Sequence, residues 1–135
     1  MYHIGHLEGE IEMPIFMKYG SIKGWSTETN HVGWIPVNSI QYGPEGARGG
    51  TVTKITCARF SDGSSTDLWN AMMDGKVVDA VIELAKTGSA TPFLKWILSQ
   101  ARITELHFSG SRDLPTEELT LNFDKAKYVY DKDAS

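Results

Sequence analysis

The residues that could carry out chemistry in this chain are four histidines, one cysteine and a pair of adjacent glutamates. His3 and His6 lie in a polar N-terminal stretch, His31 lies in a Ser/Thr/Asn-rich stretch, and His107 lies in a predicted strand. A metal or catalytic centre needs several converging donors. None of the four histidines has a convincing second donor close to it in sequence. We therefore predict no metal-binding residues and no catalytic residues.

Cys57 and the pair Glu117–Glu118 have ordinary structural interpretations. A lone cysteine inside a predicted strand is typical of core packing, and without a partner it forms no intramolecular disulfide. We expect Glu117–Glu118, directly after Thr116, to be a solvated strand start and not an acid/base pair. The sequence also lacks the nucleophile elbow, the phosphate-binding loop, the dinucleotide-binding glycines and the zinc-protease motif. These observations predict a protein that is not an enzyme and needs no cofactor.

Three tryptophans, Trp25, Trp34 and Trp96, are the candidate interaction residues. Partly exposed aromatic side chains in a β protein often mark an interface between proteins. The alternative is that the three line the cavity of a small-ligand-binding barrel.

Length and charge place the chain among small globular proteins. It has 135 residues, a formal net charge of −4 and a pI near 5.5, without a basic cluster. This composition predicts one domain and argues against nucleic acid as a partner. The longest apolar run, from Val77 to Ala85, is interrupted by Asp79 and Glu83, so no membrane insertion is expected. The N-terminus shows no signal-peptide pattern, which predicts a cytoplasmic protein that, if exported, does not use an ordinary signal peptide.

Hydrophobic alternation predicts a mainly β fold of about seven antiparallel strands, closed as a barrel or sandwich and flanked by one short helix. We expect a peripheral extension at residues 1–12, the folded domain at 13–131 and a tail at 132–135. Ser65 or Thr66 is expected to cap the N-terminus of the helix, which carries the apolar residues Leu68, Trp69, Met72 and Met73 and ends at a left-handed Gly75. The predicted strands are Ile15–Ile22, Trp34–Tyr42, Val52–Phe60, Val77–Lys86, Phe93–Arg102 with its continuation Ile103–Ser109, and Glu118–Tyr130.

The strand from Phe93 to Arg102 is apolar on both predicted faces. Phe93, Ile97 and Ala101 alternate with Leu94, Trp96 and Leu98. One face meets the core, and the other needs a cover, which the helix or another subunit could supply. In the last strand, Leu119, Leu121 and Phe123 share the core phase, and after Asp124 the aromatic residues change phase, which indicates a bulge or a change of environment.

Several segments, in order, resemble the Hcp family, the tube proteins of bacterial type VI secretion systems. They are Phe16-Met17-Lys18, Ile22-Lys23-Gly24-Trp25-Ser26, His31, Ile35-Pro36-Val37, Tyr42-Gly43, the helix region with Gly75-Lys76, Glu117 to Phe123, and Tyr128-Val129-Tyr130. The resemblance extends over nearly all of residues 13–131. Three features depart from many relatives: Trp25 stands where they have an acidic residue, the loop after Tyr42 is shorter, and the C-terminal tail is shorter.

The resemblance implies a structural subunit without catalytic activity. Six copies would form a ring, and rings would stack into a tube that carries small effector proteins and is expelled with a spike protein by contraction of a sheath. The protein would act first in the bacterial cytoplasm and then outside the cell. In the family the loop after Tyr42 reaches a neighbouring subunit or ring. That role would fall here to Gly43, Pro44, Glu45, Gly46, Ala47, Arg48, Gly49 and Gly50. A tube protein of a related phage-tail-like contractile particle is the nearest alternative.

Overall fold

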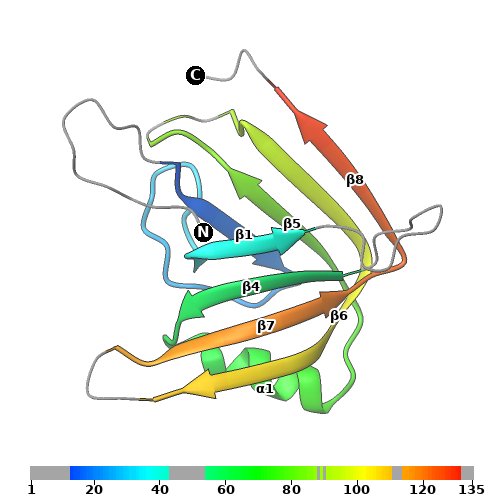
Figure 1. Ribbon diagram of the computed structural model, residues 1–135. Coiled ribbons are helices and arrows are strands. Elements are labelled where there is room, and N and C mark those ends of the chain that lie inside the picture. The colour runs from blue at the N-terminus through cyan, green and yellow to red at the C-terminus, as the bar shows by residue number, and fades with distance from the viewer. Residues whose placement is uncertain (1–12, 43–53, 88, 90, 111–113, 132–135) are drawn as a thin grey trace.

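The computed structural model describes residues 13–42, 54–87, 89, 91–110 and 114–131. All of its strand pairs are antiparallel, and one short helix accompanies them (Figure 1). The mainly β fold with one helix is therefore confirmed. The elements are β1 (Ile15–Tyr19), β2 (Ile35–Val37), β3 (Ser39–Tyr42), β4 (Lys54–Phe60), α1 (Ser65–Met73), β5 (Val78–Leu84), β6 (Leu94–Ser109), β7 (Thr116–Asn122) and β8 (Lys125–Tyr130).

Hydrogen bonding links the strands in the order β2-β1-β5-β6-β7-β4-β3, with β8 also paired to β6. The predicted strand Trp34–Tyr42 is divided at Asn38, because β2 pairs with β1 whereas β3 pairs with β4. Pro36, which lacks an amide hydrogen, lies in β2 at the end of this path, as an edge strand requires. The path ends at β2 and β3 without closing, so the fold is barrel-like with an open seam among the described residues.

A long bent hairpin joins the two halves of the fold. β6 is one continuous strand of 16 residues, and β7 and β8 run along it one after the other (Figure 1). The predicted final strand is thus two strands separated by Phe123 and Asp124. The amide of Asp124 donates to Ser99 O at 3.0 Å, which keeps the hairpin paired through the bend. The phase change expected after Asp124 is confirmed.

The bend in β6 also corrects the assignment of its faces. Gln100 has a positive φ of 53°, and the register between β5 and β6 shifts here. The extra residue turns Ala101 to the core, on the same side as Trp96 and Leu98, and all three are buried. The expected second apolar face is therefore reduced to Phe93 and Ile97, which are half-buried.

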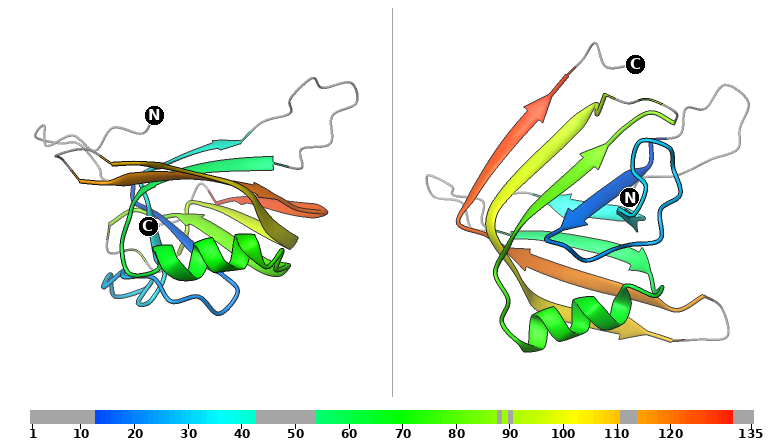
Figure 2. Two further views of the ribbon diagram at one scale, coloured as in Figure 1. Left: turned by 90° about the horizontal axis from the view of Figure 1, so that it is seen from below. Right: turned by 180° about the vertical axis from the view of Figure 1, so that it is seen from behind.

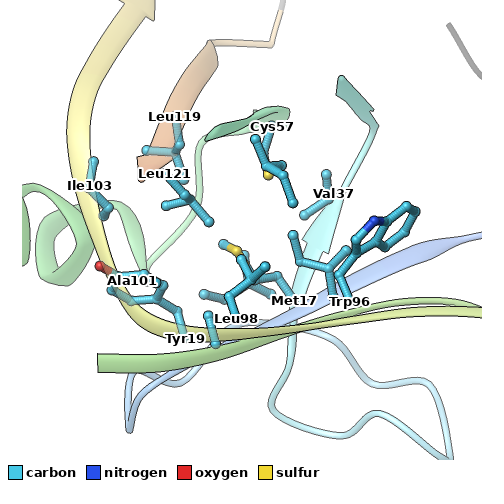
Figure 3. Packing of buried hydrophobic residues seen from close by; sticks show 14 of the residues in the cluster. Met17, Tyr19, Val37, Cys57, Trp96, Leu98, Ala101, Ile103, Leu119 and Leu121 are labelled. Atoms are coloured by element: carbon cyan, nitrogen blue, oxygen red, sulfur yellow. The ribbon is translucent and has the colours of Figure 1, made fainter. Parts of the chain in front are cut away.

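The core fills the space between the halves of the bent sheet (Figure 3). Leu119, Leu121 and Phe123 are buried, as alternation predicted. Cys57 is also fully buried, and this burial raises the pKa of its thiol to about 12, which fits the packing role. The other buried members of the core are Ile15, Met17, Tyr19, Ile35, Val37, Ile55, Leu68, Ala71, Ala80, Ile82, Trp96, Leu98, Ala101 and Ile103.

Helix α1 lies against the C-terminal half of β6 (Figure 2). Its cap residue is Ser64 and not the expected Ser65 or Thr66, which are the first two residues of the helix, whereas Gly75 after its end has the expected left-handed φ of 63°. Leu68 and Ala71 are buried, whereas Trp69 and Met73 are exposed, so only part of the predicted apolar stripe meets the core. Within the described residues, no helix has the length and apolar character needed to cross a membrane.

Candidate assembly surfaces

The three candidate tryptophans lie in different environments. Trp25 is 66% exposed and lies against Gly63, because a β-carbon added there would come within 2.4 Å of the indole ring. Trp34 is half-buried, and Trp96 is only 5% exposed. Any interface role of Trp96 must therefore act through the residues that cover it. The predicted stacking loop, Gly43 to Gly50, lies outside the described residues, as do His3 and His6.

A separate seam, between β3 and β8, is lined by three aromatic side chains. The ring of Trp96 stacks on that of Tyr128, with ring centres 5.3 Å apart, and lies tilted against that of Tyr42, with ring centres 5.6 Å apart. Tyr42 and Tyr128 bridge the seam with ring centres 6.3 Å apart. Tyr128 is largely exposed and belongs to β8, which pairs on one side only within the described part of the chain. This seam is a surface that another strand or loop could cover.

A second surface is the groove between α1 and the end of β6. It has a volume of about 480 Å³ and apolar walls from Trp69, Leu106 and Phe108. Phe108 is 62% exposed and Trp69 is about half exposed. The groove lies beneath the edge of β6, whose residues 102–109 pair with β7 on one side and with no described strand on the other. An apolar groove beside an unpaired strand edge is typical of a protein interface.

A buried ion-pair cluster supports the floor of this groove. The side chain of Arg59 is completely buried, with one guanidinium nitrogen 2.6 Å from Asp62 Oδ1 and Nε 3.5 Å from Glu117 Oε1. Nε also donates to Phe60 O at 3.0 Å, and NH1 donates to Ser64 Oγ at 3.0 Å. The cluster thus ties the turn before α1 to strands β4 and β7.

Glu117 corrects the expectation of a solvated strand start. It is buried, and it accepts hydrogen bonds of 3.1 Å from Ser61 Oγ and Ser65 Oγ. The sequence does contain the signal for this. Arg59 shares the inward phase of Ile55 and Cys57, and Glu117 shares that of Leu119. The two charged residues are direct neighbours across the β4–β7 pair. Glu118, on the other face, is exposed as predicted.

Asp62 makes the stability of this cluster depend on pH. Burial raises the pKa of Asp62, but hydrogen bonds from Ser64 and the charge of Arg59 outweigh it, and the net pKa lies below 3.8. A carboxyl with a lowered folded-state pKa adds stability above its unfolded pKa and loses it as the pH falls through the folded value. We expect the melting temperature to drop below about pH 4, and Asp62→Asn to reduce this acid-dependent part. Circular dichroism melts at a series of pH values measure both, and superimposable pH profiles for the two proteins would refute the assignment.

A further buried cluster surrounds His31. Its Nδ1 lies 2.7 Å from Glu28 Oε1, and its Nε2 lies 2.8 Å from Glu83 Oε1 on β5. Glu28 and Glu83 flank the histidine, but only Glu28 is near it in sequence, since Glu83 is 52 residues away. Sequence reasoning missed this cluster because no sequence pattern connects His31 with Glu83, which lies 52 residues away. His107, in contrast, is exposed and 3.6 Å from Glu105. Among the described residues, no three His, Cys, Asp or Glu side chains form a group that could hold a metal ion.

Comparison with known proteins decides the family. The sequence profile of the family described as "Type VI secretion system effector, Hcp" matches residues 16–130, which is most of the chain. The chain belongs to the Hcp family. The resemblance stated from the sequence motifs is thereby confirmed. No curated protein matches the chain.

Solved Hcp structures share the fold. Hcp1 from Salmonella typhimurium is 24% identical, with a TM-score of 0.81 over 92% of this chain and 91% of that one. A type VI secretion system effector from Yersinia pestis is 25% identical, with a TM-score of 0.78 over 86% of this chain and 88% of that one. The sheath–tube complex of an extracellular contractile injection system, PVC, contains a chain that is 18% identical, with a TM-score of 0.60 over 93% of this chain and 95% of that one. The Hcp fold therefore extends to a contractile particle of another kind.

Proposed function

We propose that this Hcp-family chain is the structural subunit of the inner tube of a type VI secretion system. Six copies close into a ring, and rings stack into a tube that carries small effector proteins. Contraction of a sheath expels the tube together with its spike protein. The chain is made in the bacterial cytoplasm and leaves the cell through this apparatus. Membership of the Hcp family supports this role, and two features of the fold support the assembly.

The observation that carries the proposal is the pair of unpaired edges on one sheet. Strands β3, β4, β7 and the second half of β6 form a four-stranded sheet in which β3 and β6 have no outer partner among the described strands. If β6 of one copy lies beside β3 of the next, the sheet continues from copy to copy around a ring. Identical head-to-tail contacts of this kind close into rings and cover strand edges that would otherwise invite aggregation.

The groove of Trp69, Leu106 and Phe108 supports the same contact. These side chains lie on the core side of the β6 edge, so a neighbouring copy placed against that edge would cover them. The outer face of the same sheet is polar apart from Ala58 and Phe60. We propose that this polar face lines the channel, where it would bind passing effectors only weakly. Its other residues are Ser39, Gln41, Lys54, Thr56, Arg102, Glu105, His107, Ser109, Thr116, Glu118, Thr120 and Asn122.

Two other functions receive less support. A tube subunit of a phage-tail-like particle is favoured only by the likeness to the PVC chain, which at 18% identity concerns the fold. In a small-ligand-binding barrel, Trp25, Trp34 and Trp96 would line one cavity. Trp25 instead lies on the surface against Gly63, and Trp96 is buried against Tyr42 and Tyr128. The stacking role of Gly43 to Gly50 stays a prediction.

Negative-stain electron microscopy of the purified protein tests the assembly. We expect six-fold rings with a central hole, and short tubes as the concentration rises. Small particles of single-copy size at every concentration would contradict the proposal. Imaging of sheared cell supernatants, compared with those of a strain that lacks the sheath, tests whether the tubes leave the cell through contraction.

A further inference from the structure

His31 connects a surface loop to the sheet through ionisable groups and is itself almost fully buried. His31 is 1% exposed. Its ring stacks on the ring of Phe16 in β1, with ring centres 4.2 Å apart and an interplanar angle of 9°. Trp34 meets the ring edge-on at 4.9 Å. Two aromatic neighbours therefore exclude water from the imidazole, while its two nitrogens face Glu28 and Glu83 at 2.7 and 2.8 Å.

This geometry suits the protonated ring only. An imidazolium has two N–H groups and can donate to both carboxylates at once, whereas the neutral ring has one donor and one lone pair. Without the extra proton, one carboxylate oxygen faces the nitrogen lone pair. Both are hydrogen-bond acceptors, so this contact is repulsive. The charged form also balances the two carboxylates better, because Lys95, 3.5 Å from Glu83, is the one further cation paired with Glu83 in the part of the chain that the structure describes.

Charged groups near His31 come from its own loop and from strands β5 and β6. Its own loop contributes Glu28, β5 contributes Glu83, and β6 contributes Lys95 through Glu83. β1 presents the uncharged Phe16, with Lys18 two residues further along the strand. Loss of the proton therefore leaves two carboxylates near an uncharged ring, with the partly exposed Lys95 beside one of them.

The loop that His31 fastens is braced internally. Gly24 N donates to Gly33 O at 2.9 Å, Ser26 N donates to Trp34 O at 3.0 Å, and Gly33 N donates to Ser26 O at 2.9 Å. Its side-chain attachments to the rest of the fold include the ring of Trp25 on Gly63, the stacking of His31 on Phe16 and the polar contact of His31 with Glu83. Trp25 and Val32, which are 66% and 70% exposed, are carried by this loop. The polar contact of His31 with Glu83 is thus one of the attachments that set the orientation of these two exposed apolar side chains.

We propose that His31 is a proton-dependent positioning residue. As an imidazolium it holds residues 24–34 against the sheet and presents Trp25 and Val32 in a fixed orientation, and loss of the proton releases the loop. The release itself takes place within one copy and can be measured whether or not rings form.

Amide-hydrogen protection of residues 24–34 tests the proposal in dilute, single-copy protein. When the pH is raised far enough for His31 to lose its proton, we expect the protection factors of this loop, corrected for the intrinsic pH dependence of exchange, to fall about tenfold, as expected for losing one hydrogen bond to a charged group. In His31→Gln the loop should be weakly protected at every pH. His107→Gln, which changes an exposed histidine, should keep the wild-type profile.

The outcomes separate clearly. A wild-type loop whose protection does not change with pH, or a His31→Gln profile that matches the wild type, would overturn the proposal. If His31→Gln does not fold, the ring nitrogens of wild-type His31 give the answer by NMR. Two protonated nitrogens at acid pH, with loop amide signals that shift together with the loss of one proton, support the proposal. A ring that is neutral at every pH at which the protein is folded contradicts it. Rings that fail to form leave these readings unchanged.

Discussion

We expect Arg59→Ala to lower the free energy of unfolding by about 3–5 kcal/mol, which is the usual effect of removing one partner of a buried ion pair. Arg59 is completely buried and is the cation nearest to both Asp62 and Glu117. Its removal leaves two carboxylates without that charge, and Glu117 is itself buried between β4 and β7. Urea denaturation followed by circular dichroism measures the change.

The matched control is Arg102→Ala, which removes an exposed arginine from β6. An exposed substitution of this kind is expected to change stability by no more than about 0.5 kcal/mol. If Arg59→Ala were no more destabilising than Arg102→Ala, the ion-pair cluster would not stabilise the fold. A double variant, Arg59→Met with Glu117→Leu, should recover part of the loss, because apolar side chains replace the charges of the cross-strand pair.

The second large effect concerns assembly and not folding. Phe108→Glu places a charge at the rim of the groove, where the proposed neighbour covers an apolar surface. Central apolar residues of an interface contribute about 2 kcal/mol or more, which corresponds to about thirtyfold in affinity at each contact. Since a ring repeats the contact, we expect Phe108→Glu to yield single copies at concentrations at which the wild type forms rings. Sedimentation velocity measures the distribution of sizes.

Folding and assembly must be separated in this experiment. Phe108 is 62% exposed, so the variant should keep the melting temperature of single wild-type copies within a few degrees. Met73→Glu is a suitable control because Met73 is equally exposed on α1 and does not line the groove. Rings of normal size from Phe108→Glu would show that neighbouring copies meet elsewhere.

Local patterns predicted most of the core but not the way in which strands divide. Alternation correctly identified Leu119, Leu121 and Phe123, and the left-handed Gly75 followed from the helix pattern. The division of Trp34–Tyr42 at Asn38 was not predictable, because it depends on β2 and β3 pairing with different strands. The bend at Gln100 escaped prediction for a similar reason, since glutamine carries no local signal for a positive φ.

The polar clusters were harder to predict than the core. Arg59 and Glu117 both show the inward phase, but they become a pair only when β4 is known to lie beside β7. His31 and Glu83 are joined across 52 residues and belong to a loop and a strand that share no pattern. The sequence thus indicated the family and the absence of a recognisable catalytic motif, whereas the buried charges that set pH dependence required the three-dimensional structure.

Native mass spectrometry of the purified protein tests the central claim most directly. The account predicts a dominant species of six times the 15.0 kDa chain mass, with multiples of that species at higher concentration. The same spectra of Phe108→Glu should show the single chain. A wild-type protein that remains a single chain at all concentrations, or that assembles with a number other than six, would contradict the account.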